Sequence, residues 1–119
     1  MELRIPADSA FLSVLRTATA GLAARLDFTL DDIEDLRIAV DEASAMVLPQ
    51  ARPGSDLACA FDLEKYRLTV SVTAECDAPK EPSRDGFAWT VLAALTTSLS
   101  ASVDGDTLTV TLSRTTIES

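Results

Sequence analysis

One carboxylate, Glu42, lies in surroundings that suit chemistry. At about 100° per residue, the side of a helix that carries Glu42 also carries Ile38, Ala45 and Met46. The solvent side of a helix is normally polar, so this mostly apolar side is expected either to be covered by a second element or to line a pocket. A carboxylate among apolar side chains can act as a general base with a raised pKa, and the alternative is an ordinary solvated acid.

The helix that positions Glu42 is predicted to run from Thr29 to Leu48. Thr29 is the predicted N-cap, and Asp32 places a carboxylate in the first turn, where the positive end of a helix favours acids. Another side of this helix repeats apolar residues at spacings of three and four and is predicted to face the core. These residues are Ile33, Leu36, Val40, Ala43 and Val47.

Two patterns precede this helix. Leu3 and Ile5 alternate with polar residues and predict a short strand that Pro6 ends. A second helix is predicted over about 8–26, with Arg16 outside its apolar stripe and therefore exposed. That stripe consists of Phe11, Val14, Leu15, Ala18, Leu22 and Leu26.

The remaining patterns complete the predicted fold. Alternating apolar residues over 57–61 and 68–72 predict a β-hairpin with one face toward the helices. The polar stretch 75–86 is the longest predicted loop, followed by a third helix from Phe87 to Leu99 and a final strand over 108–112. The order β-α-α-β-β-α-β-β predicts an α+β fold, a two-layer sandwich with three main helices on one face of a mostly antiparallel sheet.

Composition limits the class of protein. The 119 residues, 47% of them hydrophobic, predict one domain over 1–119 with a substantial core. A net charge of −9 argues against a nucleic-acid surface, and the absence of histidine excludes His-based catalytic triads and argues against a zinc site. Because no secretory leader or membrane-spanning run is recognisable and Cys59 and Cys76 are too few for a disulfide framework, a cytoplasmic location is expected, with Cys59 a small core residue.

The predicted element order, with a carboxylate on the second long helix, resembles the ATPase domain shared by gyrase, histidine kinases and MutL (the GHKL superfamily, or Bergerat fold). Within that superfamily, the segment LDFTLDDIEDLRIAVDEA at 26–43 is similar to bacterial anti-sigma factors of the sporulation and general-stress type, which double as serine protein kinases. The likeness extends more loosely over nearly the whole chain. It implies a GHKL-like fold and ATP and Mg²⁺ as the cofactors of kinase chemistry.

The resemblance assigns roles to residues on and after the second helix. Glu42 matches the glutamate that acts as the base, and Met46 stands where the family carries an asparagine that holds Mg²⁺. A thioether offers magnesium no hard oxygen, which argues against kinase chemistry. Asp77 matches the acid that binds the adenine amine, but Pro79 replaces the first glycine of that box, fixing φ and removing a donor.

The phosphate-binding motifs of the family are altered as well. Gly86 matches one glycine of the second box, where bare backbone N–H groups meet phosphate, and Ala88 replaces the other. The segment that matches the ATP lid is only 80–85, and the family's closing turn before the last strand resembles Gly105 to Thr107. The nucleotide-binding residues implied by resemblance are therefore Asp77, Gly86 and Thr107, and no metal ligand is assigned.

The kept scaffold and altered motifs favour a binding regulator. This hypothesis is an anti-sigma factor that sequesters an alternative RNA polymerase sigma factor and is released by a STAS-type anti-anti-sigma protein. The alternative is an active ATP-dependent serine protein kinase that phosphorylates that antagonist, and an inert scaffold with other partners is a third reading. The resemblance also implies a homodimer and partner contacts through the first helix, where Arg16 matches an arginine; the alternative for Arg16 is a solvated surface residue.

Overall fold

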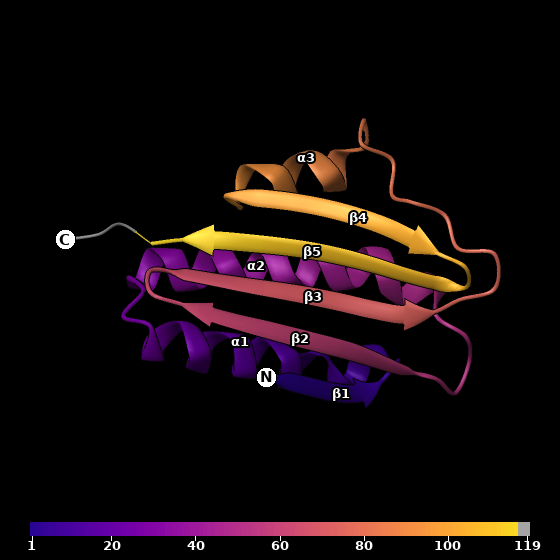
Figure 1. Cartoon of the computed structure of the whole chain (residues 1–119), viewed down its shortest axis with the longest axis horizontal. Helices are drawn as coiled ribbons and strands as arrows, with labels where there is room; N and C mark the ends of the chain where they lie inside the picture. The colour runs from indigo at the N-terminus through magenta and orange to yellow at the C-terminus, as the bar shows by residue number, and fades with distance from the viewer. Residues whose placement is uncertain (117–119) are drawn as a thin grey trace.

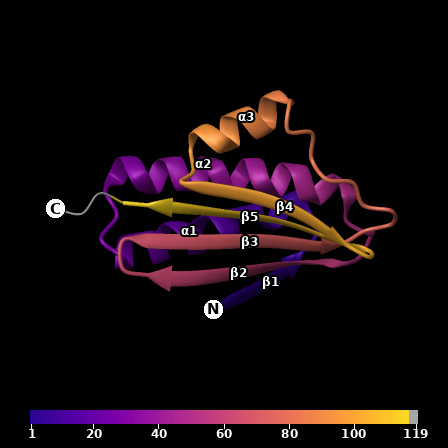
Figure 2. The same ribbon diagram turned by 45° about the horizontal axis from the view of Figure 1, so that its top comes forward.

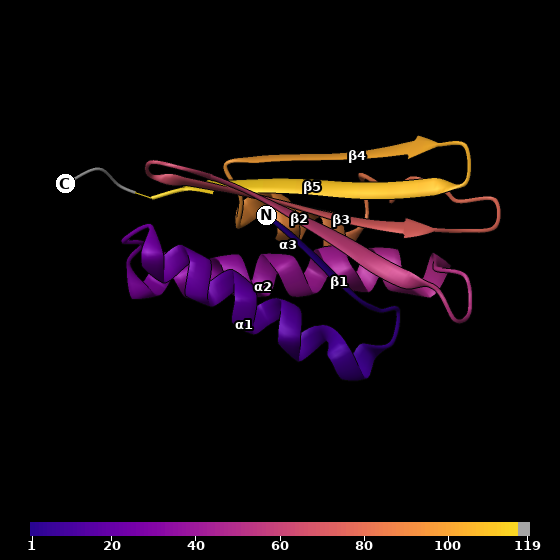
Figure 3. The ribbon, with the colours of Figure 1, turned by 60° about the horizontal axis from the view of Figure 1, so that its bottom comes forward.

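The computed structural model describes residues 1–116, which form a five-stranded antiparallel sheet with helices on one side (Figure 1). The strands are ordered β1-β2-β3-β5-β4. Figure 3 shows all three α-helices on the same side of the sheet, so the predicted α+β two-layer sandwich is confirmed. The elements are β1 (Glu2–Pro6), α1 (Leu12–Arg25), α2 (Leu30–Val47), β2 (Asp56–Glu64), β3 (Arg67–Glu75), α3 (Phe87–Ala94), β4 (Ser98–Asp104) and β5 (Thr107–Thr115), with 3-10 turns at Ser9–Phe11 and Leu48–Gln50.

Helix α2 is the central helix of the layer that covers the sheet. The Thr29 side chain accepts a hydrogen bond from the Asp32 backbone N–H at 3.1 Å, which confirms the predicted N-cap. Leu36, Val40 and Val47 are fully buried, as the apolar spacing predicts. Side chains of this size each contribute about 1.5–3 kcal/mol when removed from water, so this stripe fixes α2 against the sheet.

The sheet meets α2 with an alternating set of side chains. Each strand turns every second residue toward the helices, and on β2, β3 and β5 most of these residues are almost fully buried, whereas Leu63 near the end of β2 is 39% exposed. Cys59 is one of them, and burial raises the pKa of its thiol to about 11, which fits the predicted role as a small core residue. The buried set on these strands is Leu57, Cys59, Phe61, Leu68, Val70, Val72, Ala74, Leu108, Val110 and Leu112.

Helix α1 presents a different stripe from the predicted one. Phe11 and Val14 are 41% and 45% exposed, so their prediction as core residues is wrong. Phe11 belongs to a 3-10 turn, whose tighter period does not continue in phase into α1. Thr19 is buried instead. This burial is tolerated because the Thr19 hydroxyl donates to the Leu15 carbonyl at 2.8 Å, so that no buried polar group is left unsatisfied.

The third helix is shorter than predicted. It ends at Ala94, and Leu99 lies in β4 with its side chain packed against the core. The Thr97 N–H donates to the Ser113 carbonyl at 2.7 Å, so the chain has already joined the sheet there. Within residues 1–116, no helix combines the length and apolar character needed to span a membrane.

A buried ion-pair cluster joins the start of α2 to the end of the sheet. Arg114 Nη2 lies 2.7 Å from Asp32 Oδ1 and 3.0 Å from Asp35 Oδ2, and the Thr116 hydroxyl donates to Asp32 Oδ2 at 2.7 Å. Arg114 also donates to the Leu95 carbonyl at 2.6 Å, beyond the end of α3. The Thr116 hydrogen bond, reinforced by Arg114, lowers the pKa of Asp32 although its burial acts in the opposite direction.

Replacing Asp32 by Asn is expected to lower the free energy of unfolding by about 2–4 kcal/mol at neutral pH, because Arg114 then keeps only part of its pairing in a mostly buried position. A carboxyl whose pKa is lowered by folding stabilises the protein above its unfolded pKa, near 3.9, and loses that contribution as the pH falls through the folded pKa. The difference between wild type and Asp32→Asn in urea melts should therefore shrink below about pH 4. Asp31→Asn, at an exposed neighbour, should cost less than about 1 kcal/mol, and an equal loss in both variants would contradict this account.

Candidate functional site

An apolar hollow of about 300 Å³ lies between the C-terminal part of α2 and the start of α3. Figure 2 shows α3 beside α2, with the connection from β3 passing around the end of the sheet to reach it. Met46 supplies the α2 wall, which confirms that part of the apolar side of α2 lines a pocket. The remaining lining residues are Pro82, Ser83, Gly86, Phe87, Ala88 and Trp89.

The residues of this hollow do not fit a magnesium nucleotide. Magnesium prefers oxygen ligands, and among the lining residues only Ser83 carries a side-chain oxygen. The lining contains no Lys or Arg to meet phosphate, and Ala88 adds a methyl group at the start of α3. Within residues 1–116 there is also no group of three or more His, Cys, Asp or Glu side chains placed to hold a metal ion.

Asp77, which the resemblance assigns to adenine, lies outside this lining and is engaged elsewhere. Arg52 Nε lies 2.8 Å from Asp77 Oδ1, and Arg52 Nη2 lies 3.1 Å from Asp106 Oδ2. The hydrogen bond and charge of Asp77 are the main causes that raise the pKa of Arg52. Arg52 thus joins the connection after α2 to the segment after β3 and to the turn between β4 and β5. The Asp77 carboxylate is already paired in this structure.

The segment that resembles the ATP lid is tethered to the end of α2. Gln50 Nε2 donates to the Lys80 carbonyl at 3.0 Å, and the Lys80 N–H donates to Gln50 Oε1 at 2.8 Å. Further along, Arg84 stacks over the Trp89 ring at 4.7 Å from its centroid and pairs with Glu81 at 3.2 Å. These contacts hold the segment against α2 and α3.

The base and the third nucleotide-binding residue implied by the resemblance, Glu42 and Thr107, are not brought to the hollow. Glu42 is half-buried on α2 but does not line it, and within residues 1–116 it makes no side-chain hydrogen bond or ion pair. Ile38 on the same side of α2 is 40% exposed, so no second element covers this part of the helix. Thr107 lines a different hollow, on the opposite face of the sheet. The structure thus joins Met46 and Gly86 and separates them from Glu42, Asp77 and Thr107.

Arg16 lies on α1 at the surface that α1 and α2 share. Its Nε is 3.2 Å from Asp41 Oδ1 on α2, and its side chain is 38% exposed. Arg16 was predicted to be exposed, and it is only partly so, because its guanidinium is paired with Asp41 of the same chain. An Arg–carboxylate pair at a surface keeps a planar hydrogen-bonding group within reach of a partner.

Sequence reasoning missed three polar residues with structural roles, Arg52, Gln50 and Arg114. Arg52 and Gln50 lie in a turn-rich stretch, where only the folded chain shows which carboxylate or peptide group each one meets. Arg114 carried a signal, because it continues the inward-facing series of Leu108, Val110 and Leu112 on β5. A charged residue at such a position predicts a buried carboxylate partner.

No family model matches the chain, but curated proteins do. It is 40% identical over 74 residues to the serine-protein kinase RsbW of Halalkalibacterium halodurans, covering 61% of this chain and 46% of that protein. It is 31% identical over 105 residues to the anti-sigma-F factor RsbW of Mycobacterium tuberculosis, covering 88% and 62%. A Bacillus thuringiensis serine-protein kinase RsbW is 35% identical over 74 residues, covering 60% and 46%.

The chain thus spans between 46% and 62% of the length of these relatives. The matches agree with the three-helix, five-strand sandwich and with the resemblance that the segment 26–43 carries. On both grounds, the chain is similar to the RsbW-type anti-sigma factors and serine-protein kinases, and its fold is GHKL-like.

Proposed function

We propose that this chain is an anti-sigma factor that acts by binding, sequesters an alternative sigma factor without nucleotide, and is released by a STAS-type anti-anti-sigma protein. The observation that carries the proposal is the apolar hollow at Met46, where a kinase of this family would need an oxygen ligand for Mg²⁺. The ion pair of Arg52 with Asp77 supports the same conclusion, because it engages the carboxylate that would bind adenine. A protein that acts only by binding a partner needs the fold but not the residues that would hold ATP and Mg²⁺.

The proposed contact with the partners includes the α1–α2 surface at Arg16. In the free chain the guanidinium is paired with Asp41, so a partner carboxylate would exchange with that pair or extend it. Such an exchange leaves no guanidinium unpaired in either state, which favours specificity and reversible release over very tight binding. Reversibility is what release by a second protein requires.

A second candidate function is a serine protein kinase that phosphorylates the antagonist with ATP. Glu42 is the observation in its favour, since it is half-buried and free of ion pairs within residues 1–116. Met46 follows it by one helical turn on the same side, where the magnesium ligand would be required. The two functions make opposite predictions for nucleotide binding.

Calorimetric titration with Mg·ATP is expected to show weak or no binding. The reason is that the hollow supplies neither a magnesium ligand nor a cation for the phosphates. The same titration without Mg²⁺ should give the same result. Magnesium-dependent micromolar affinity would contradict the proposed function and favour the kinase.

Arg16→Ala is expected to weaken binding of the cognate sigma factor or its STAS-type antagonist by about 1–3 kcal/mol, because Arg side chains are common anchors of interfaces. The free energy of unfolding should change by less than about 1 kcal/mol, since the Asp41 pair is a surface ion pair. Isothermal titration against each partner, with a melting curve for each variant, measures both effects.

Glu42→Gln is the matched control for that experiment. For a protein that acts by binding alone, this variant should keep sigma affinity within about threefold, or about 0.7 kcal/mol. Unchanged affinity of Arg16→Ala for both partners would remove Arg16 from the proposed interface. A large loss in Glu42→Gln would show that the carboxylate, or a nucleotide bound near it, shapes the surface.

A further inference from the structure

Strand β1 forms one edge of the sheet, and its outer side is not covered by another strand. Within residues 1–116, β1 pairs only with β2, and it is the outermost strand in the order β1-β2-β3-β5-β4 (Figure 1). The edge of a sheet carries backbone donors and acceptors that can pair with a further chain. This border of the sheet is named the β1 edge below.

The free backbone groups of the β1 edge follow from the pairing of β1 with β2. The Phe61 N–H donates to the Met1 carbonyl at 2.8 Å, and the Met1 nitrogen donates to the Phe61 carbonyl at 3.1 Å. In an antiparallel pair, residues that exchange hydrogen bonds alternate with residues whose N–H and C=O groups point away from the partner strand. Because the register continues without interruption to Pro6, the N–H and C=O groups of Glu2 and Arg4 point away from β2 and toward the free side.

An apolar hollow of about 270 Å³, named the edge hollow here, lies between the β1 edge and α1. Leu3 of β1 and Phe61 of β2 line it from the sheet, and Ala18, Gly21 and Leu22 line it from α1. In a further antiparallel strand, the residue opposite Leu3 would point to the same side of the sheet as Leu3. Its side chain would therefore meet the edge hollow.

Gly21 leaves the α1 side of the edge hollow free of a side chain. A glycine inside a helix lowers stability relative to alanine, because it loses more conformational freedom on folding. An added Cβ at Gly21 would meet no atom of residues 1–116 within 4 Å, so close packing does not require glycine there. What the glycine provides is open space, since the residue is exposed. This favours a binding surface over a gap in the packing.

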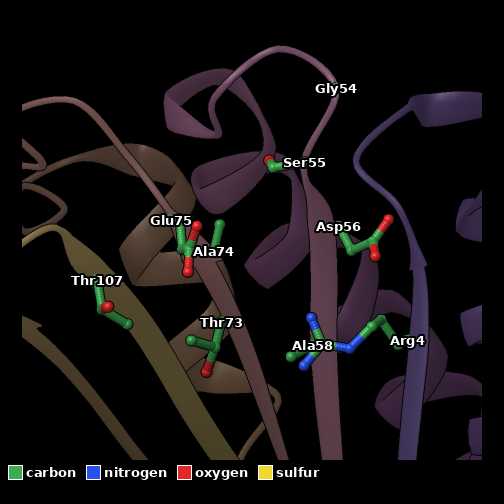
Figure 4. A pocket seen from close by; sticks show the side chains of 9 residues that line it. All are labelled: Arg4, Gly54, Ser55, Asp56, Ala58, Thr73, Ala74, Glu75 and Thr107. Carbon is green, nitrogen blue, oxygen red and sulfur yellow. The ribbon is translucent and has the colours of Figure 1, made fainter.

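The two exposed residues of β1 that flank Leu3 carry opposite charges. Figure 4 shows the Arg4 side chain beside Ala58 of β2, at the border of the polar hollow that Thr107 also lines. Neither Glu2 nor Arg4 forms an ion pair among residues 1–116. Opposite charges on directly opposed residues stabilise an antiparallel pair, so a further strand would match with a base opposite Glu2 and an acid opposite Arg4.

These features together select an extended peptide as the occupant. A small apolar molecule or a helix could fill the edge hollow, but it would leave the N–H and C=O groups of Glu2 and Arg4 to water. A further strand pairs with those groups, places an apolar side chain in the hollow and sets two charges opposite their counterparts.

We propose that the β1 edge and the edge hollow bind an extended segment of another protein as an antiparallel strand, in which an acid, an apolar residue and a base lie opposite Arg4, Leu3 and Glu2. This binding surface does not rest on the proposed function, because the residues that line the edge hollow include neither Met46 nor the Arg16–Asp41 pair. Failure of sigma binding, or binding of nucleotide, would leave it standing.

A synthetic peptide with blocked ends and the sequence Thr-Val-Glu-Leu-Lys-Val-Thr is the probe. Its Glu, Leu and Lys would lie opposite Arg4, Leu3 and Glu2. Titration of the wild-type chain, followed by backbone NMR, should show saturable binding and slower hydrogen exchange of the Glu2 and Arg4 N–H groups. The same peptide with serine in place of leucine should bind about tenfold more weakly or worse, because no apolar side chain then leaves water. Equal binding of the two peptides, or unchanged exchange of both N–H groups, would overturn the proposal.

Gly21→Met tests the edge hollow. The methionine side chain would occupy the hollow and should weaken peptide binding by about tenfold or more. Its melting temperature should not fall below that of wild type, because methionine forms helices better than glycine. Ser13→Met, the same side chain at an exposed position earlier on α1, should bind the peptide like wild type. Full affinity in Gly21→Met would show that the hollow does not take part.

Arg4→Pro tests the pairing of strands. Proline removes an N–H that points away from β2, so the ladder between β1 and β2 is kept. This variant should bind the peptide about fivefold more weakly than Arg4→Ala, the matched control that removes the same charge. Equal binding of the two variants would show that the hollow holds an apolar group without strand pairing. Slower exchange of the Arg4 N–H at higher concentrations of the chain alone would show that a second copy occupies the edge. Either result would contradict the proposal.

Discussion

The guanidinium of Arg114 joins the sheet, the central helix and the segment that follows the third helix. It reaches from the end of β5 to Asp32 and Asp35 at the start of α2, and to the Leu95 carbonyl just after α3. The sheet, the central helix and the short third helix therefore meet at one charged group that is mostly buried. A buried charge is tolerated only with partners on several sides, so the cluster fixes the relative position of all three elements. Thr116 completes it by a hydrogen bond to Asp32.

The residues that the resemblance assigns to nucleotide binding have different chemistry in this frame. The hollow between α2 and α3 is present, yet Met46 and Ala88 line it with apolar groups. Arg52 pairs with the carboxylate that resemblance assigns to adenine, and Gln50 tethers the segment next to it. A folded domain does not depend on its ligand when its own residues satisfy the polar groups left behind. The proposed function, binding without nucleotide, agrees with this exchange of partners.

The two faces of the molecule offer different kinds of surface. The helical side presents Arg16 paired with Asp41, and exposed apolar side chains such as Ile38, which are typical of a surface that recognises another protein. The sheet side presents hydroxyl groups that are hydrogen-bonded to one another across neighbouring strands.

The sequence alone determined the elements whose signals are local. The N-cap at Thr29, the apolar stripe of α2 and the alternation on β2, β3 and β5 all follow from spacing, because neighbouring residues decide which way each side chain points. Among the residues that the resemblance assigns to a nucleotide site, Met46 and Gly86 meet at one hollow, while Asp77 and Thr107 do not join them.

Only the tertiary structure decided where α3 ends, which side of α1 is buried and which residues form ion pairs with one another. Leu99 fits a helical stripe equally well, but pairing with β5 draws its segment into the sheet. Arg52 meets Asp77 across 25 positions, and Arg114 meets Asp32 across 82. Contacts of this range depend on how the whole chain is folded, and no local pattern of residues contains that information.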